Sequence, residues 1–182
     1  MIRLFAAIAL PEEIGRPLQG RQLGLPGARW RPLEALHITL RFFGDLPEDR
    51  ADDLDAELST VTGEAFDLSL AGVGHFGEGV DIHAVWAGVE DSVPLRQLQK
   101  RCEAAARRAG MAAETRAYLP HVTLAYLKRP AAPDVAAWEQ EHNLLRSPPF
   151  RVDRFSLYSS HQTRTASVYR LERSYPLQTA PA

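Results

Sequence analysis

His37-Ile38-Thr39-Leu40 and His121-Val122-Thr123-Leu124 repeat one order of histidine, β-branched apolar residue, threonine and leucine. This alternation predicts two β-strands, because side chains at positions i and i+2 lie on the same face of a strand. The apolar residues of each stretch are therefore expected to face a core. Each histidine is expected beside its own threonine on the opposite face. A third His-x-Thr stretch, His161-Gln162-Thr163-Arg164, lacks the apolar residues and is interpreted as unrelated.

Two such strands, placed face to face, would bring two imidazoles and two hydroxyls into one cleft suited to phosphoryl chemistry. One neutral imidazole can accept a proton from an attacking water, and a protonated one can donate a proton to a leaving oxygen. The hydroxyls of Thr39 and Thr123 can donate hydrogen bonds to phosphate oxygens as negative charge develops there. The sequence thus predicts His37, His121, Thr39 and Thr123 as catalytic residues of a site that requires no cofactor.

Other interpretations of the repeated motifs are weaker. The histidines could be hydrogen-bonded members of a packed sheet, and the threonines could reflect β-propensity alone. The histidines could also ligate zinc, but zinc needs a third protein ligand, and no Asp, Glu or His lies two positions from either histidine. No metal site is therefore predicted. His75, His83, His142 and His161 show no partner in the sequence and are not expected to be catalytic.

Four residues that flank the motifs are candidates for substrate binding. Arg41 is expected on the face of His37, where it could hold phosphate or ribose, although an exposed edge-strand arginine fits equally well. Phe43 and Tyr126 could stack on a nucleobase or belong to the core; strict alternation extended to residue 126 places Tyr126 on the core face. Arg129 follows the second motif and could contact phosphate or lie on a solvated face.

Composition limits the class of protein. The chain of 182 residues is expected to form a single domain, residues 1–182. A net charge of −2 disfavours a general nucleic-acid binder, so any contact with RNA must be local. The single cysteine, Cys102, excludes an internal disulfide and a cysteine-based zinc site, and it fits a reducing compartment.

The apolar run from Leu4 to Leu10 is too short to span a membrane and lacks a signal-peptide cleavage region. It predicts a buried first strand, and we expect a cytoplasmic, monomeric protein without membrane contact.

Local patterns predict an α+β fold of two similar lobes, each an antiparallel sheet with helices outside and the active-site cleft between them. Helices are expected at 11–21, 47–62, 93–109 and 134–142. Strands are expected at 3–10, 28–31, 37–43, 66–73, 82–89, 114–117, 119–127, 150–159 and 166–171, with a glycine-rich loop at 72–79. Each half of the chain contains one motif strand, which is why the two halves are expected to echo each other.

At these motifs the sequence resembles the 2H phosphoesterases, which are named for two His-apolar-Thr/Ser-apolar motifs. More closely, it resembles the bacterial RNA 2′,3′-cyclic phosphodiesterases, also called 2′-5′ RNA ligases. The flanks are similar as well, so that the likeness covers nearly the whole chain: LFAAI at 4–8, HITLRFFG at 37–44, the glycine-rich stretch at 72–77, PHVTLA at 120–125, and LYSS at 157–160 followed by Tyr169.

The resemblance implies a bilobal fold and hydrolysis of a terminal 2′,3′-cyclic phosphate on RNA to a 2′-phosphate. It makes His37 the proton donor and His121 the proton acceptor. The chain departs from the family at Tyr126, where many relatives carry arginine, and at Ala166, where glycine is frequent.

Three alternatives remain open. They are action on a small nucleotide cyclic phosphate, reversible 2′-5′ ligation of RNA, and a non-catalytic module that binds RNA ends. The last is disfavoured because binding alone needs no matched acid and base.

Overall fold

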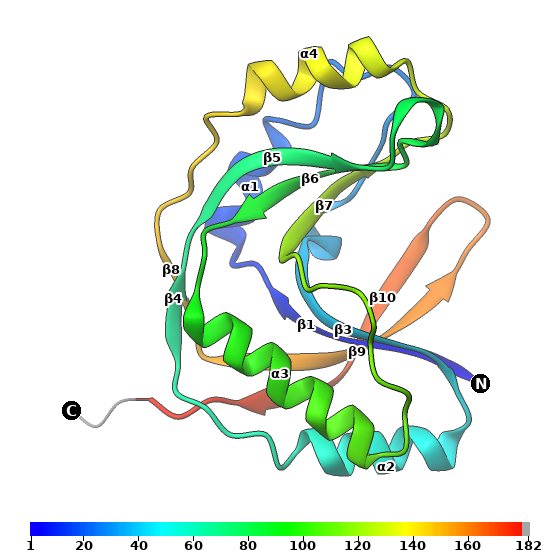
Figure 1. Ribbon diagram of the computed structural model, residues 1–182, viewed down its shortest axis with the longest axis vertical. Helices are drawn as coiled ribbons and strands as arrows, with labels where there is room; N and C mark the ends of the chain where they lie inside the picture. The colour runs from blue at the N-terminus through cyan, green and yellow to red at the C-terminus, as the bar shows by residue number, and fades with distance from the viewer. Residues whose placement is uncertain (180–182) are drawn as a thin grey trace.

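Eight strands form one bent, antiparallel sheet in the computed structural model, which describes residues 1–179 (Figure 1). Four strands, which we call the first lobe, run in the order β10-β9-β1-β3: Ser167–Pro176, Arg154–Gln162, Ile2–Ala9 and His37–Leu46. The second lobe consists of β7 (His121–Tyr126), β6 (Ala84–Val89), β5 (Leu70–Phe76) and the short β2 (Arg29–Trp30), which pairs with β7. The predicted α+β class and the two antiparallel lobes are confirmed.

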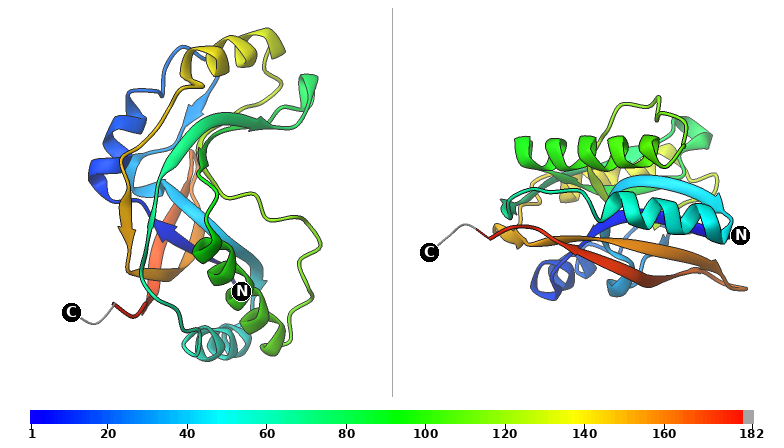
Figure 2. Two further views of the ribbon diagram at one scale, coloured as in Figure 1. Left: turned by 60° about the vertical axis from the view of Figure 1, so that its left-hand side comes forward. Right: turned by 90° about the horizontal axis from the view of Figure 1, so that it is seen from below.

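The two lobes meet at the motif strands. Strands β3 and β7 pair through one recorded position only, Ile38 opposite Val122. By contrast, β1 pairs with β3 along the whole length of β1, and β6 pairs with β7 from Ala84 to Gly88. The sheet is therefore continuous but loosely joined at the centre, so the lobes splay apart there and give the molecule its C-shape (Figure 2).

The helices lie outside the lobes, as predicted. Helices α2 (Glu48–Leu58) and α3 (Val93–Arg108) pack on each other and against the first lobe (Figures 1 and 2). Helix α4 (Ala132–His142) packs on β5 of the second lobe, and its Trp138 indole donates a hydrogen bond to the carbonyl of Arg21, just after α1 (Glu12–Gln19). Two 3₁₀ turns, Leu33–Ala35 and Gly79–Asp81, and a small separate ladder of β4 (Phe66–Leu68) with β8 (Phe150–Val152) complete the fold.

Helix α3 shows how the local sequence determines an element. The Ser92 hydroxyl accepts a hydrogen bond from the backbone N–H of Leu95, and Pro94 occupies the first turn, where its missing N–H has no cost. Leu95, Leu98 and Cys102 recur at helical spacing and are fully or almost fully buried. One apolar cluster includes these residues together with residues of both lobes.

Two predicted segments are wrong. The glycine-rich stretch at 72–79 is mostly strand, because β5 continues through Phe76 and pairs with Ala84. No strand forms at 114–117. That segment is held instead by side chains: the Glu114 N–H donates to the Glu103 carboxylate (2.9 Å), and the Tyr118 hydroxyl donates to the Thr39 carbonyl (2.9 Å).

A β-bulge follows the threonine of each motif. Ala7 of β1 pairs with Thr39 of β3, and Ala6 pairs with Arg41, so Leu40 of β3 has no pairing partner on β1. Trp86 of β6 pairs with Thr123 of β7, and Val85 pairs with Ala125, so Leu124 of β7 has no pairing partner on β6. An extra residue in one strand reverses the facing of the side chains that follow it, up to the next such shift. Phe42 and Tyr126 thereby come to the face of the histidines, contrary to strict alternation.

The same bulge removes Arg41 from the histidine face, so its predicted placement beside His37 is wrong. Arg41 is buried, and its guanidinium donates to the Glu103 carboxylate (2.6 Å) and to the Ala112 carbonyl (2.8 Å). Phe43 lies in the main apolar core. We therefore propose no substrate contact for Arg41 or Phe43.

Arg41→Met is expected to lower the free energy of unfolding by about 3 kcal/mol, because it leaves the partly buried Glu103 carboxylate without its cation. The kcat/KM of the folded variant should remain close to that of the wild type. Urea unfolding and steady-state kinetics measure the two effects. Arg3→Met, which breaks an exposed ion pair with Asp45, serves as a control that should change little. A stable variant with low activity would show that Arg41 contacts substrate after all.

Candidate active site

The pairing of Ile38 with Val122 brings the two motifs together on one face of the sheet. In an antiparallel pair centred on these residues, His37 lies opposite Thr123 and Thr39 lies opposite His121. All four side chains leave the face opposite the buried Ile38 and Val122. The two histidines occupy diagonal positions, which are about 7–8 Å apart in a regular ladder. That spacing leaves room for one phosphate group between the two rings.

His37 lies against aromatic side chains of the first lobe. The centroid of its ring is 4.5 Å from that of Tyr158, 5.6 Å from that of Tyr169 and 6.1 Å from that of Phe5. The side chains of Phe5 and Tyr158 stack on each other and are buried together. These contacts fix the orientation of the imidazole and remove most of it from water.

The environment of His37 disfavours its charged form. Burial, and after it the positive charge of Arg31, lowers the pKa of His37 from 6.5 to about 4; the Ala35 backbone opposes this shift in part. The Nδ1 atom is buried, and no group among residues 1–179 forms a hydrogen bond of ordinary geometry with it. The ring is thus neutral in the free protein at neutral pH.

His121 has a defined tautomer. Its Nδ1 lies 2.7 Å from the carbonyl oxygen of Leu119. Because a carbonyl only accepts, Nδ1 carries the proton, which leaves the Nε2 lone pair of the neutral ring free to act as a base. Burial lowers the pKa of His121, although the hydrogen bond to Leu119 acts in the opposite sense. A neutral, oriented imidazole with an available lone pair can accept a proton.

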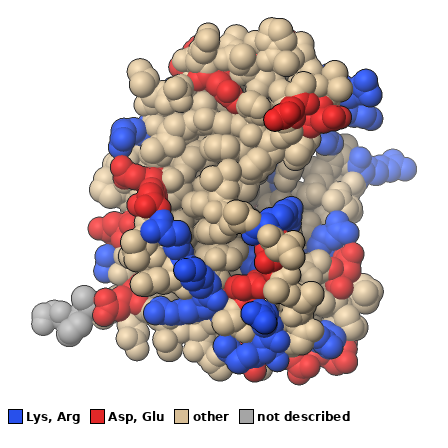
Figure 3. Space-filling view, in the orientation of Figure 1, with Lys and Arg blue, Asp and Glu red and all other residues tan. Residues whose placement is uncertain are grey.

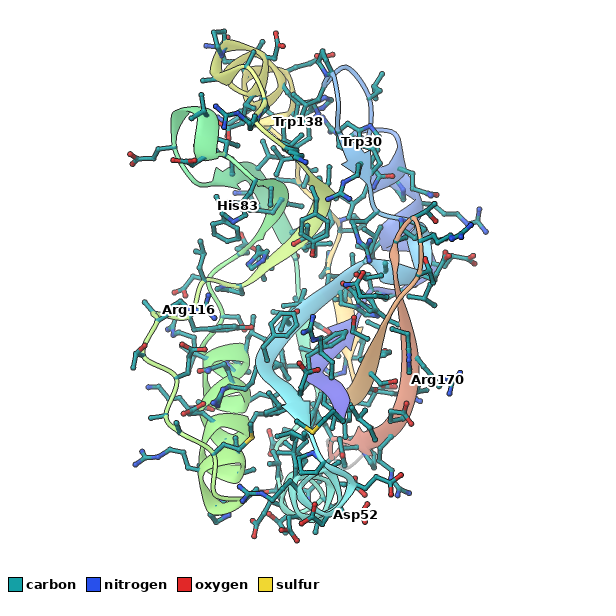
Figure 4. The ribbon with its side chains drawn as sticks, turned by 90° about the vertical axis from the view of Figure 1, so that its right-hand side faces the viewer. Trp30, Asp52, His83, Arg116, Trp138 and Arg170 are labelled. Atoms are coloured by element: carbon teal, nitrogen blue, oxygen red, sulfur yellow. The ribbon has the colours of Figure 1, made fainter. Side chains whose placement is uncertain are left out.

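Aromatic residues of the second lobe surround His121. Phe76 meets it edge to face with 4.7 Å between ring centroids, and Trp86 lies 6.1 Å away. The Phe76 ring also stacks with the exposed ring of His83, with 6.3 Å between the ring centroids. Gly74 permits this arrangement, because any Cβ at that position would collide with the Trp86 indole. Figure 4 shows His83 at the rim of the second lobe, with Arg116 across the space between the lobes.

The threonines and the remaining candidates are placed as follows. Thr39 and Thr123 are half-buried, and no hydrogen bond within the described chain engages either hydroxyl. Tyr126 lies on the histidine face beneath the guanidinium of Arg31, 5.5 Å from ring centroid to Cζ. Arg129 is exposed in the turn after β7, and its contact with substrate remains a proposal.

His161 lies away from this face. Tyr158, which contacts His37, and Ser159 are consecutive on β9, so their side chains leave opposite faces of the strand. His161 shares the face of Ser159, and its Nε2 is 2.9 Å from the Ser159 hydroxyl. That hydroxyl donates in turn to the carboxylate of Glu172. His161 is thus a member of a hydrogen-bonded group on the hairpin.

The sequence interpretation missed Arg31, Phe42 and Trp86. Arg31 precedes Pro32 in a segment without periodic pattern. Phe42 reaches the site only because of the bulge on β3, whereas Trp86 reaches it because it pairs with Thr123 on β7. Figure 3 shows the molecular surface hollowed between the two lobes, with charged side chains mostly around the rim.

Within residues 1–179 no group of three or more His, Cys, Asp or Glu residues has a geometry suited to a metal ion. No helix in that part of the chain is long and apolar enough to cross a membrane.

Known proteins share this sequence and architecture. An RNA 2′,3′-cyclic phosphodiesterase of Geobacillus stearothermophilus is 30% identical over 188 residues, which is 97% of this chain but only 58% of that relative. The enzyme of Thermotoga maritima is 29% identical, and the alignment covers 93% of this chain and 92% of that relative. The enzyme of Methanothermobacter thermautotrophicus is 30% identical, and the alignment covers 92% of this chain and 95% of that relative.

Solved structures agree with the sequence comparison. The crystal structure of Escherichia coli LigT complexed with 3′-AMP superimposes with a TM-score of 0.78 at 25% identity, covering 97% of this chain and 98% of LigT. The model of the 2′-5′ RNA ligase superfamily matches residues 10–164. The resemblance expected from the two motifs is thereby confirmed, and this chain belongs to the 2′-5′ RNA ligase superfamily.

Proposed function

We propose that this protein hydrolyses the terminal 2′,3′-cyclic phosphate of RNA to a 2′-phosphate by acid–base catalysis without a metal ion. The observation that carries the proposal is the pairing of Ile38 with Val122, which sets His37 and His121 at diagonal positions, each opposite a threonine hydroxyl. The names of three relatives, all RNA 2′,3′-cyclic phosphodiesterases, support the reaction and the substrate class.

In the proposed reaction, His121 Nε2 accepts a proton from water as the water oxygen attacks phosphorus. The bond from phosphorus to the 3′ oxygen breaks, and protonated His37 donates its proton to that oxygen. The product carries a 2′-phosphate and a free 3′ hydroxyl. Thr39 and Thr123 donate hydrogen bonds to the non-bridging oxygens as charge develops on them. The tautomer of His121, with Nδ1–H directed at Leu119, supports its role as the base.

The partner in this proposal is an RNA that ends in a cyclic phosphate. The half-buried Phe76 and the exposed Phe42 offer surfaces on which a terminal base can stack. Action as a monomer in the cytoplasm, expected from the sequence, is part of the same proposal. Hydrolysis of small cyclic nucleotides and the reverse ligation reaction use the same pair of histidines, so substrate comparison must separate them.

The direct test is incubation of the protein with an RNA oligonucleotide ending in a 2′,3′-cyclic phosphate, in the presence of EDTA. We expect full turnover to a 2′-phosphate, with a higher kcat/KM for the oligonucleotide than for a 2′,3′-cyclic mononucleotide. His121→Ala serves as the control for contaminating nucleases. Activity that disappears in EDTA and returns with zinc or manganese would overturn the metal-free mechanism. Binding of the RNA without turnover would favour a non-catalytic module.

The pH dependence should reveal the lowered pKa values. Since kcat/KM reports the free protein, and both histidines titrate below the ordinary value of 6.5 there, its bell-shaped maximum is expected on the acid side of pH 6.5. A bound phosphate favours the protonated form of His37 and raises its pKa. The maximum of kcat is therefore expected at a higher pH than that of kcat/KM. Steady-state rates across the pH range check this, and coincident maxima above neutral pH would contradict it.

A further inference from the structure

Arg31 is a buried cation held rigidly at the junction of the lobes. Its residue is only 7% exposed. Its backbone N–H donates to the carbonyl of Leu124 on β7 (2.8 Å), and its carbonyl accepts from the Gln22 side chain (2.8 Å). The backbone of Arg31 is thus fixed next to the second motif, and little freedom remains for the side chain.

No carboxylate of residues 1–179 pairs with this guanidinium, whereas the equally buried Arg41 pairs with Glu103. The side chain of Arg31 makes one hydrogen bond, from Nη2 to the Ser167 carbonyl at 3.3 Å. A buried charge without a counter-ion is costly, so its presence calls for a compensating group. The rings of Tyr126 and Tyr169, 5.5 and 5.2 Å from Cζ, compensate in part through cation–π contacts.

The unused donors of Arg31 face accessible space. A guanidinium has five N–H donors, and the hydrogen bond to Ser167 uses only one of them. Within the described chain, Nε of Arg41 is completely buried and has no hydrogen-bond partner. No side-chain nitrogen of Arg31 is both completely buried and without a partner. Arg31 therefore combines a buried position with donors that an incoming ligand can reach.

Arg31 also lies close to the reacting groups. Tyr169 contacts both the Arg31 guanidinium and the His37 ring, at 5.2 and 5.6 Å. Tyr126, on the other side of the guanidinium, is on the histidine face of the strand that carries His121 and Thr123. A planar cation with free donors at this place is suited to an anion with two adjacent oxygens, such as a phosphate.

We propose that the Arg31 guanidinium binds a non-bridging oxygen of the phosphate that reacts between His37 and His121. This inference rests on the proposed function and assigns the anion contact of that site. It also gives Arg31 a second effect. Burial lowers the pKa of His37 most, and the charge of Arg31 lowers it further; a bound phosphate screens that charge, so that His37 gains its catalytic proton more readily as substrate binds.

The first test measures binding without turnover. The probe is 2′-AMP, and its dissociation constant is obtained by NMR from the imidazole signals of His37. Arg31→Met is expected to weaken binding by about 10–100-fold, the range for loss of a hydrogen bond to a charged group. Arg29→Met, which removes the same charge from an exposed side chain two residues earlier, on β2, should change binding by less than about threefold. Arg31→Met should change the melting temperature little, because it breaks no ion pair and loses only the hydrogen bond to Ser167 and the contacts with the two tyrosine rings.

The second test asks which oxygen is bound. Uridine 2′,3′-cyclic phosphorothioate has two diastereomers, in which sulfur replaces one or the other non-bridging oxygen. The wild type should hydrolyse one diastereomer much more slowly than the other, and Arg31→Met should bring their ratio of rates closer to one. If Arg31→Met does not fold, the test is made with Arg31→Lys. Its single ammonium group replaces the two-pronged guanidinium donor, so this substitution must also change the ratio of hydrolysis rates of the two diastereomers.

The outcomes separate the inference from the proposed function. Unchanged affinity for 2′-AMP together with an unchanged diastereomer ratio would overturn the role of Arg31, even if the wild type hydrolyses cyclic phosphates. Loss of 2′-AMP binding in Arg31→Met, with a wild type that hydrolyses no cyclic phosphate, would support the anion site and reject the proposed reaction.

Discussion

His37→Ala and His121→Ala are each expected to lower kcat by about 10²–10⁴, the usual range for loss of a general acid or base. Both residues come from a motif strand, and both rings lie on the face where the lobes meet. The double variant should lose much less than the product of the two single effects, because an acid and a base that act in one transition state behave as a unit. Steady-state hydrolysis of a 2′,3′-cyclic nucleotide measures all three variants.

The matched control for these variants is His161→Ala, which removes a histidine that is also followed by threonine at the second position. His161 bonds to Ser159 on the other face of β9, so its loss should leave kcat near that of the wild type. Circular dichroism should show that all four proteins are folded. A loss in His161→Ala as large as that in either motif variant would mean that the reacting pair has been assigned incorrectly.

A substrate with a better leaving group should rescue one histidine variant and not the other. When sulfur replaces the 3′ oxygen, the leaving thiolate needs no acid, since thiols ionise far more readily than alcohols. His37→Ala should then recover by about 10² or more, because it lacks only the proposed acid. His121→Ala should remain slow, because attack by water still requires a base. Initial rates for both substrates with both variants provide the comparison.

The identity of the product checks the same division of roles. In-line attack places acid and base on opposite sides of phosphorus, so only one ribose oxygen can face the acid. The proposal has His37 facing the 3′ oxygen, and the sole product should therefore be a 2′-phosphate. Equal rescue of both variants, or a mixture of 2′- and 3′-phosphates, would show that the two histidines do not have the separate roles assigned to them.

Local sequence determined the secondary-structure elements and indicated the residues proposed to be catalytic. The period-2 pattern around His37 and His121 reflects which side chains are buried in a strand, and the 3.6-residue period from Leu95 to Ala105 does the same for α3. Such patterns depend on neighbours within a few residues, which is why both motif strands and all four helices were predicted close to their observed bounds. The motifs also led to the correct family.

The partners of these elements were decided only by the tertiary structure. The two halves of the chain do not form the two lobes, because β9 and β10 from the C-terminal end pair with β1. A bulge depends on the strand opposite, so no local pattern could reveal that Phe42 and Tyr126 turn toward the histidines while Arg41 turns to Glu103. Arg31 is the strongest case. Its proposed role depends on the packing of β2, β7 and β10, because only the assembled fold shows that no carboxylate among residues 1–179 pairs with its buried guanidinium.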